Sequence, residues 1–185
     1  MFVAQKKKKE NIIEYLLYMW QIEDLIRSCN FDIKLISESV INKSPYSNVQ
    51  KSQLKDWYLN LMYKMESEGI QEYGHMQDLQ ETLHEVEQVH NFLINIAQLN
   101  RYQKLLKSIT PLLRELRNES NEEKSDLSIS LEFIYGVLLL KLQGKAVAES
   151  TMEALKQITL FTYELAENYK DYKQGFLSIS KAQKN

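Results

Sequence analysis

Three glutamate–histidine pairs are the side chains whose spacing is best suited to chemistry. Each pair has the Glu-x-x-His spacing that places a carboxylate beside an imidazole on one helical face, as in di-iron and di-manganese sites. The pairs are Glu72/His75, Glu81/His84 and Glu87/His90. In such sites the motif comes from two different helices, whereas here one helix is expected to carry all three copies, rotated away from one another. We therefore predict no metal ion and no cofactor.

The third pair differs from the other two in its place on the predicted helix. Glu87 and His90 lie on the apolar face of that segment, so we expect His90 to be a hydrogen-bonded core histidine. The other two pairs are expected to be solvated. The alternative is that Glu87 and His90 contribute to a ligand-binding site inside the protein.

A second polar group lies in the first predicted helix. Glu23 and Arg27 are four residues apart and share the helical phase of Trp20, so both are expected to point into the core. A buried charge without a partner is strongly unfavourable, which favours an internal ion pair between the two. The alternative is that Glu23, Arg27 and the neighbouring Asp24 form the polar floor of a ligand pocket.

Tyrosines recur on the last predicted helix. Tyr163, Tyr169 and Tyr172 are candidates for a surface that recognises a partner protein helix or a second copy of the chain. A stripe of aromatic side chains at helical spacing more often belongs to the core. Both interpretations stay open at this point.

The basic and cysteine motifs carry little chemistry. The four lysines at 6–9 lie at a predicted helix start, where positive charge opposes the helix dipole, and are expected to be solvated. Gly144-Lys145 ends like a phosphate loop, but Ala146 stands where that loop requires serine or threonine. Cys29 is the sole cysteine and cannot form an intramolecular disulfide, which favours a reducing cytoplasm.

Charge and hydropathy limit the classes of partner. The 185 residues include 23 lysines and arginines and 25 aspartates and glutamates, a formal net charge of -2. This balance argues against binding nucleic acid through the field of the whole domain. The apolar run at 137–140 is far shorter than the roughly 20 residues that cross a bilayer, so we expect no membrane insertion.

The elements that must position these residues are predicted to be helices. Only five glycines and two prolines interrupt the chain, too few for a fold of many short strands. Hydrophobic periodicity predicts helices over about 5–28, 31–41, 48–68, 73–99, 105–116, 126–143 and 151–174. We therefore predict an all-α single domain over 1–185, a bundle of about six to seven helices with a frayed tail over about 176–185.

Local signals predict where several helices begin. Asn30 is expected to cap the second, while Ser47 and Ser150 each have a capping-box partner three residues later. Pro111 is expected to cause a bend or a restart. The helices over 5–28 and 126–143 are apolar on most sides, so we expect both to lie centrally, surrounded by the others.

Three stretches together resemble a known family. They are 11–27 (NIIEYLLYMWQIEDLIR), 67–75 (SEGIQEYGH) and 135–145 (YGVLLLKLQGK). The resemblance is to a bacterial family catalogued as domain of unknown function 4924, and the stretch 77–121 departs most from its pattern. It implies a helical protein of this length and brings no activity, ligand or catalytic residue with it.

The leading functional prediction is a non-catalytic cytoplasmic protein that binds a partner protein helix or forms a homo-oligomer. It follows from a large apolar core, a weak charge bias and the absence of converging chemical groups. The alternative is a small-ligand or metal-binding protein, or an enzyme, with a site in the bundle interior. RNA binding through the lysines at 6–9 ranks last.

Overall fold

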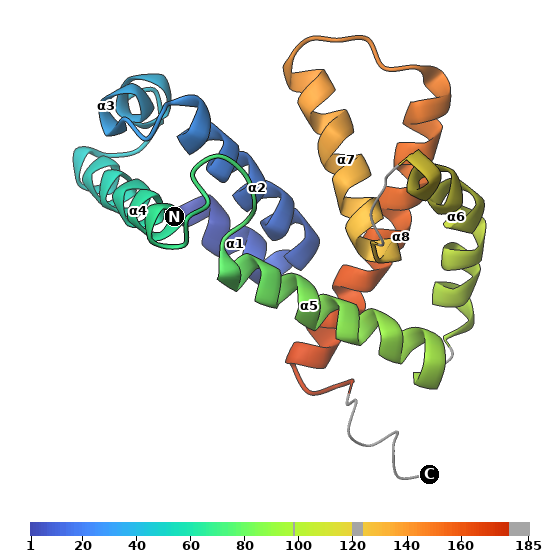
Figure 1. Cartoon of the computed structure of the whole chain (residues 1–185). Coiled ribbons are helices and arrows are strands. Elements are labelled where there is room, and N and C mark those ends of the chain that lie inside the picture. Colours follow the sequence, from blue (N-terminus) through green and yellow to red (C-terminus); the bar gives the residue numbers. More distant parts are fainter. Residues whose placement is uncertain (98, 120–123, 178–185) are drawn as a thin grey trace. The chain divides into compact units, whose positions relative to one another are not determined.

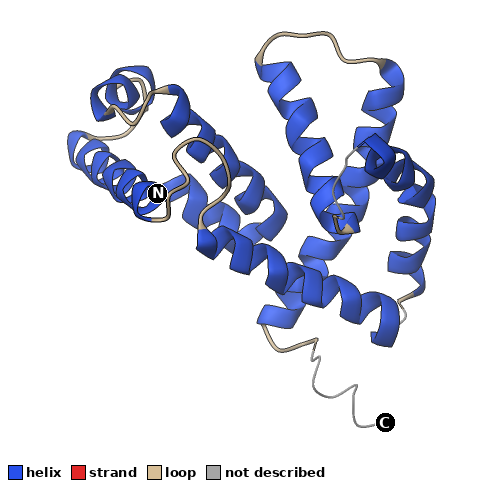
Figure 2. Cartoon of the chain, viewed as in Figure 1, coloured by secondary structure: helices blue, strands red, loops and turns tan. Residues whose placement is uncertain are grey.

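The computed structural model describes residues 1–97, 99–119 and 124–177. Within these ranges the regular elements are eight α-helices and two short π-helical turns (Figure 1). Figure 2 shows the same chain by secondary structure, and its described part contains no strand. The all-α prediction is confirmed, with slightly more helices than the six or seven expected. None of these helices is both long and apolar enough to cross a membrane.

The chain forms two compact units. The first comprises Met1–Lys9 and Glu14–Leu83, and the second comprises Glu10–Ile13 and His84–Asn185. The boundary between them falls inside helix α5 (Gln77–Phe92). The prediction of a single domain over 1–185 stays a prediction.

The first unit contains α1, most of α2, α3, a π-helical turn, α4 and the start of α5. Their bounds are Phe2–Glu10 for α1, Ile12–Ser28 for α2, Ile33–Ile36 for α3, Ser37–Ile41 for the turn and Asn48–Ser67 for α4. The single helix predicted over 5–28 is therefore wrong, because the chain breaks at Asn11. Three of the four lysines, Lys7, Lys8 and Lys9, consequently lie in the last turn of α1, where their charge is favourable to the helix dipole rather than opposed to it.

Helix α2 is buried on most of its circumference, as its composition predicts. Its fully or nearly fully buried side chains include large apolar residues on several faces: Ile12, Ile13, Leu16, Leu17, Met19, Trp20, Ile22 and Ile26. A helix covered on so many sides gains stability from every face, at about 25 cal/mol for each Å² of apolar surface removed from water. Any polar side chain on it must therefore find its partners inside the protein.

At two helix starts in this unit the predicted capping residues can be compared with the structure. Ser47 and Gln50 form the predicted capping box, with Ser47 Oγ accepting the N–H of Gln50 at 3.3 Å. Asn30 does not cap the next helix. It has a positive φ of 49°, and Asp32 caps instead, accepting the N–H of Lys34 at 2.7 Å. Asparagine is favoured both as a helix N-cap and in the left-handed conformation, and here Asn30 adopts the left-handed conformation of a turn.

The second unit contains the rest of α5, a π-helical turn and three further helices. The turn is Leu93–Ala97, and the helices are α6 (Asn100–Glu119), α7 (Asp126–Leu142) and α8 (Glu149–Lys173). Helices α6, α7 and α8 pack against one another pairwise. Their core includes the fully buried side chains of Tyr102, Ile109, Leu113, Leu131, Phe161 and Leu165.

Two predicted helix boundaries in the second unit are wrong. Helix α6 runs through Pro111 without a restart, although proline cannot donate the N–H that would bond the carbonyl one turn earlier. The alternative prediction, a bend at Pro111, stays a prediction. Helix α8 begins at Glu149, with Ala148 as its N-cap and no side-chain cap, so Ser150 lies inside the helix rather than capping it. The predicted stops at Gly144 and Gly175 are correct, and both have the positive φ expected of a helix-ending glycine.

Helix α7 departs most from its predicted environment. Its first half is covered, since Leu127 and Leu131 are fully buried. Its second half is not, because the side chains of Leu138 and Leu139 are only partly buried and those of Leu140 and Leu142 are exposed. The expectation of a helix surrounded on all sides is therefore wrong for this half. Periodicity reports how apolar a helix is but not how many neighbours the fold provides.

The core of the second unit can be tested with two neighbouring residues of α8. Phe161 is fully buried, whereas Leu160 is 48% exposed. We expect Phe161→Ala to lower the free energy of unfolding by about 4 kcal/mol, because it leaves a cavity. We expect Leu160→Ala to lower it by no more than about 1 kcal/mol. Urea denaturation followed by circular dichroism measures both, and equal losses would contradict the burial described here.

Candidate functional site

His90 is the buried histidine of the second unit. Its Nδ1 lies 2.5 Å from the hydroxyl oxygen of Tyr102, and its ring meets those of Tyr102 and Phe161 edge-on. Burial lowers the pKa of His90 and raises that of Tyr102 far above its ordinary range. The imidazole is thus neutral and the phenol protonated at neutral pH. The prediction of a hydrogen-bonded core histidine is confirmed.

A pocket of about 350 Å³ lies against this histidine. It is lined by Glu87, His90, Asn91, Ile94, Asn95, Ser125 and Asp126. The two residues that the sequence proposed for an interior ligand site, Glu87 and His90, therefore face the same space. Sequence reasoning missed the asparagines and the start of α7, although Asn91 and Asn95 follow Glu87 at the four-residue spacing of one helical face.

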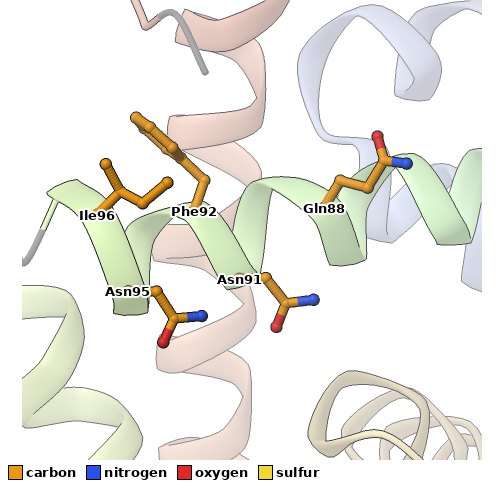
Figure 3. A pocket seen from close by; sticks show the side chains of 5 residues that line it. All are labelled: Gln88, Asn91, Phe92, Asn95 and Ile96. Carbon is orange, nitrogen blue, oxygen red and sulfur yellow. The ribbon is translucent and has the colours of Figure 1, made fainter. Parts of the chain in front are cut away.

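A second, shallower pocket of about 300 Å³ follows the same stretch of chain. Figure 3 shows the side chains that line it: Gln88, Asn91, Phe92, Asn95 and Ile96. The amides of Asn91 and Asn95 point to the same side of the helix, one turn apart. They border both pockets, so this face of α5 and the following π-helical turn presents amides to solvent.

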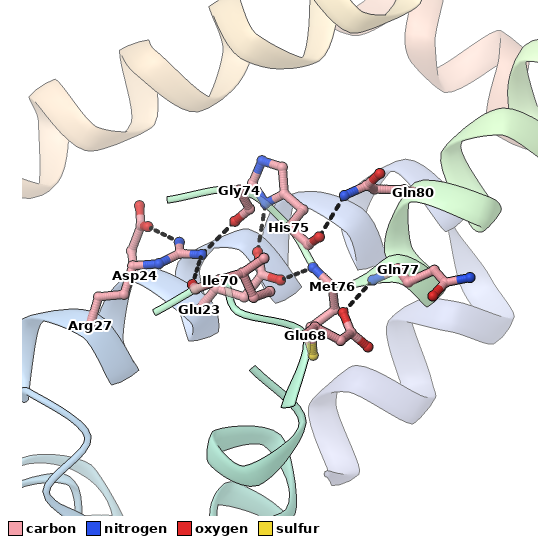
Figure 4. Close-up of polar contacts among 10 residues, drawn as sticks. All are labelled: Glu23, Asp24, Arg27, Glu68, Ile70, Gly74, His75, Met76, Gln77 and Gln80. Carbon is pink, nitrogen blue, oxygen red and sulfur yellow. Dashed lines mark hydrogen bonds and ion pairs between the residues drawn. The ribbon is translucent and has the colours of Figure 1, made fainter. Parts of the chain in front are cut away.

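The third candidate group lies in the first unit and centres on Glu23. This side chain is fully buried in α2 (0% exposed), yet its carboxylate has two partners in the segment between α4 and α5 (Figure 4). One oxygen accepts the backbone N–H of Met76 at 2.8 Å, and the other lies 2.6 Å from Nδ1 of His75. Two hydrogen bonds of this kind offset part of the cost of burying the charge.

The ring of His75 is held from a second direction. It stacks on the indole of Trp20, with ring centroids 4.4 Å apart and an interplanar angle of 14°. The side chain of Gln80 donates a hydrogen bond to the His75 carbonyl at 2.7 Å. His75 was expected to be a solvated helical residue, and this is wrong, because α5 begins only at Gln77. Gly74, the residue before His75, was the sequence feature from which a later start of this helix could have been predicted.

Arg27 bonds to the backbone of the same segment. Its guanidinium donates to the carbonyl oxygens of Ile70, at 3.2 Å, and Gly74, and it pairs with Asp24 at 2.9 Å. The ion pair predicted between Glu23 and Arg27 is therefore wrong, since each side chain binds the 68–76 segment instead. The Nε of Arg27 is buried without a hydrogen-bond partner in the described structure.

These contacts give the group around Glu23 the geometry of a structural clamp, and the alternative role of Glu23, Asp24 and Arg27 as a pocket floor stays a prediction. Glu23 and Arg27 bind backbone groups of one connecting segment, and the N–H of Gln77 at the start of α5 is capped by Glu68 at 2.7 Å. Figure 4 shows the polar atoms turned toward one another. Within the described ranges, no three histidine, cysteine, aspartate or glutamate side chains gather as a metal ion would require.

The three tyrosines of α8 have different environments. Tyr169 is buried and its hydroxyl donates to Glu85 at 2.7 Å, which places it in the core. Tyr172 is partly buried, and Tyr163 is exposed. A continuous recognition stripe of all three is thus not formed, while the interface prediction for Tyr163 stays a prediction.

The clamp predicts a large difference between two glutamates of α2. Glu23→Ala removes the acceptor of a buried N–H, so we expect the free energy of unfolding to fall by roughly 3 kcal/mol. Glu14→Ala is the control, because Glu14 is exposed and pairs with Lys7 at the surface, an interaction worth at most about 1 kcal/mol. Chemical denaturation compares the variants. A Glu23→Ala protein as stable as the wild type would show that the clamp contributes nothing.

Burial of His90 predicts a pH dependence of stability. Because the folded pKa is lowered, the unfolded chain binds a proton that the folded chain does not, and stability is lost as pH falls below about 6.5. The slope from one such group approaches about 1.4 kcal/mol per pH unit. We expect His90→Gln to reduce this slope and His84→Gln, at an exposed histidine, to keep it. Urea denaturation from about pH 5 to about pH 7.5 measures how the free energy of unfolding changes with pH in each protein. The same pH dependence in the wild type and both variants would show that His90 is not its source.

Comparison with known proteins identifies the family of the chain. No match was found among curated proteins or among solved structures. One family model, described as "Domain of unknown function (DUF4924)", matches residues 1–176 and so covers nearly the whole chain. The resemblance seen in the sequence is confirmed, and the chain belongs to the DUF4924 family.

Proposed function

We propose that this chain is a non-catalytic helical protein of the cytoplasm that associates with another protein helix, in the first place through a second copy of itself. The observation that carries the proposal is the uncovered second half of α7. Leu140 is 37% exposed and Leu142 is 67% exposed, on a helix whose composition is that of a buried one. Apolar side chains that are exposed in the free chain lose their contact with water when a partner covers them, which favours binding.

The start of α8 extends this apolar character. The connection between α7 and α8 is short, so Met152 follows Leu142 closely along the chain, and it too is exposed. Leu160 and Tyr163 come eight and eleven residues after Met152, which places all three within about 80° of one another around the helix. We call Leu140, Leu142, Met152, Leu160 and Tyr163 the apolar surface.

A second copy of the chain is the occupant that suits the apolar surface best. Two copies related by a two-fold axis would bury the same apolar side chains against one another. Homodimer interfaces are also the more apolar class of protein interface. A helix from a different protein would use the same side chains.

The interior site of the alternative hypothesis receives less support from the first unit. The atoms of Glu23 and Arg27 that were candidates for a pocket floor bind backbone groups instead.

The proposed location in the cytoplasm is supported by Cys29, which is a free and buried thiol.

Light scattering on the purified chain tests the proposal. We expect a mass of twice 21.9 kDa for the wild type and a single-chain mass for the double variant Leu140→Glu, Leu142→Glu. A glutamate in place of a buried leucine must lose its hydration, and its two copies repel each other across a two-fold interface. The control is Val49→Glu, which places a charge on an equally exposed apolar residue of α4 and should leave the dimer intact. A wild type of single-chain mass at all concentrations rejects self-association.

A further inference from the structure

We propose that the pocket beside His90 binds a small organic amine that also carries hydroxyl groups. This inference is independent of the proposed self-association, because it concerns a different set of side chains. The pocket volume of about 350 Å³ lies in the usual range of small-molecule sites, about 300–1,000 Å³. Its wall comes from α5, the following π-helical turn and the start of α7.

His90 supplies a fixed hydrogen-bond donor. Tyr102 is fully buried, and Nδ1 of His90 is the acceptor within reach of its hydroxyl. A buried hydroxyl without an acceptor is unfavourable, so Tyr102 donates and Nδ1 accepts. The proton of the neutral imidazole is then on Nε2, the ring nitrogen that does not contact Tyr102, and His90 is one of the residues that line the pocket. Burial lowers the pKa of His90 and keeps the ring in this neutral form.

The carboxylates of the pocket give it one unbalanced negative charge. Asp126 pairs with the guanidinium of Arg117, which neutralises it. Glu87 is held by neutral donors on one oxygen, with Oγ of Ser125 at 2.5 Å and Oγ of Ser128 at 3.3 Å. Its other oxygen lies 3.9 Å from Nδ1 of His84, beyond hydrogen-bond distance.

The charge of the pocket selects the class of ligand. Among the described residues that line it there is no lysine or arginine. A ligand carboxylate or phosphate would therefore meet Glu87 without a compensating cation. A ligand ammonium would instead form a charge-assisted hydrogen bond with the oxygen that Ser125 leaves open.

Asn91 and Asn95 suit the hydroxyl groups of such a ligand. Each amide offers both a donor and an acceptor, which matches the two roles of a hydroxyl. Neither side chain has a hydrogen-bond partner in the described part of the chain, so a ligand need not break an existing bond. Figure 3 shows both amides on one side of the helix, which allows them to bind neighbouring hydroxyls.

Three six-carbon compounds that differ at one end test the charge preference. They are glucamine, sorbitol and gluconate, which end in an ammonium, a hydroxyl and a carboxylate. In calorimetric titrations of the full chain we expect glucamine to bind at least about tenfold more tightly than sorbitol, and gluconate not to bind. Tighter binding of gluconate, equal binding of all three, or no saturable binding of glucamine would each overturn the proposal.

Two variants locate the binding in this pocket. Glu87→Gln removes the charge but keeps an oxygen that accepts from Ser125, so we expect glucamine affinity to fall at least about tenfold, to the level of sorbitol. Asn91→Ala, an exposed change that leaves the core intact, should weaken glucamine and sorbitol alike. The control is Asp171→Asn, which removes one exposed negative charge of α8 outside the pocket and should leave affinity unchanged. Equal affinity in Glu87→Gln and the wild type, with equal melting temperatures, would place the binding elsewhere.

Discussion

The first unit depends on one constraint, the charge of Glu23 inside a helix that is covered on most sides. A carboxylate removed from water must receive hydrogen bonds from the protein, and those bonds can come only from groups held in place. The segment between α4 and α5 supplies them through the N–H of Met76 and the ring of His75. The same segment gives its carbonyl oxygens to Arg27. One buried charge thus helps to hold this connection in its conformation, together with the buried side chain of Met76.

The second unit also buries a polar side chain, but it does so without a charge. His90 is also a polar side chain among apolar ones, but it is kept neutral and uses one ring nitrogen for Tyr102. Glu23 has both oxygens occupied, whereas His90 leaves a nitrogen for the space beside it. A saturated polar group stabilises a fold, and a group with remaining hydrogen-bonding capacity can also bind a ligand. This difference separates the clamp of the first unit from the pocket of the second.

Much of the helical architecture was predictable, because it depends on local physics. The scarcity of glycine and proline, the capping box at Ser47 and the stops at Gly144 and Gly175 act within a few residues. The errors arise where tertiary contacts decide. Pro111 is tolerated within α6, and the second half of α7 lacks the neighbours that its composition suggested. Of the candidate sites, the burial of His90 was predictable from phase, but the partners of Glu23 lie some fifty residues away in sequence.

The π-helical turn Leu93–Ala97 has a consequence for how this region tolerates change in length. In such a turn each N–H bonds to the carbonyl five residues back, one residue more than in an α-helix. Deleting one of these five residues would bring the repeat back to that of an α-helix, and because the turn ends this helix, the change in length would be taken up before α6 begins at Asn100.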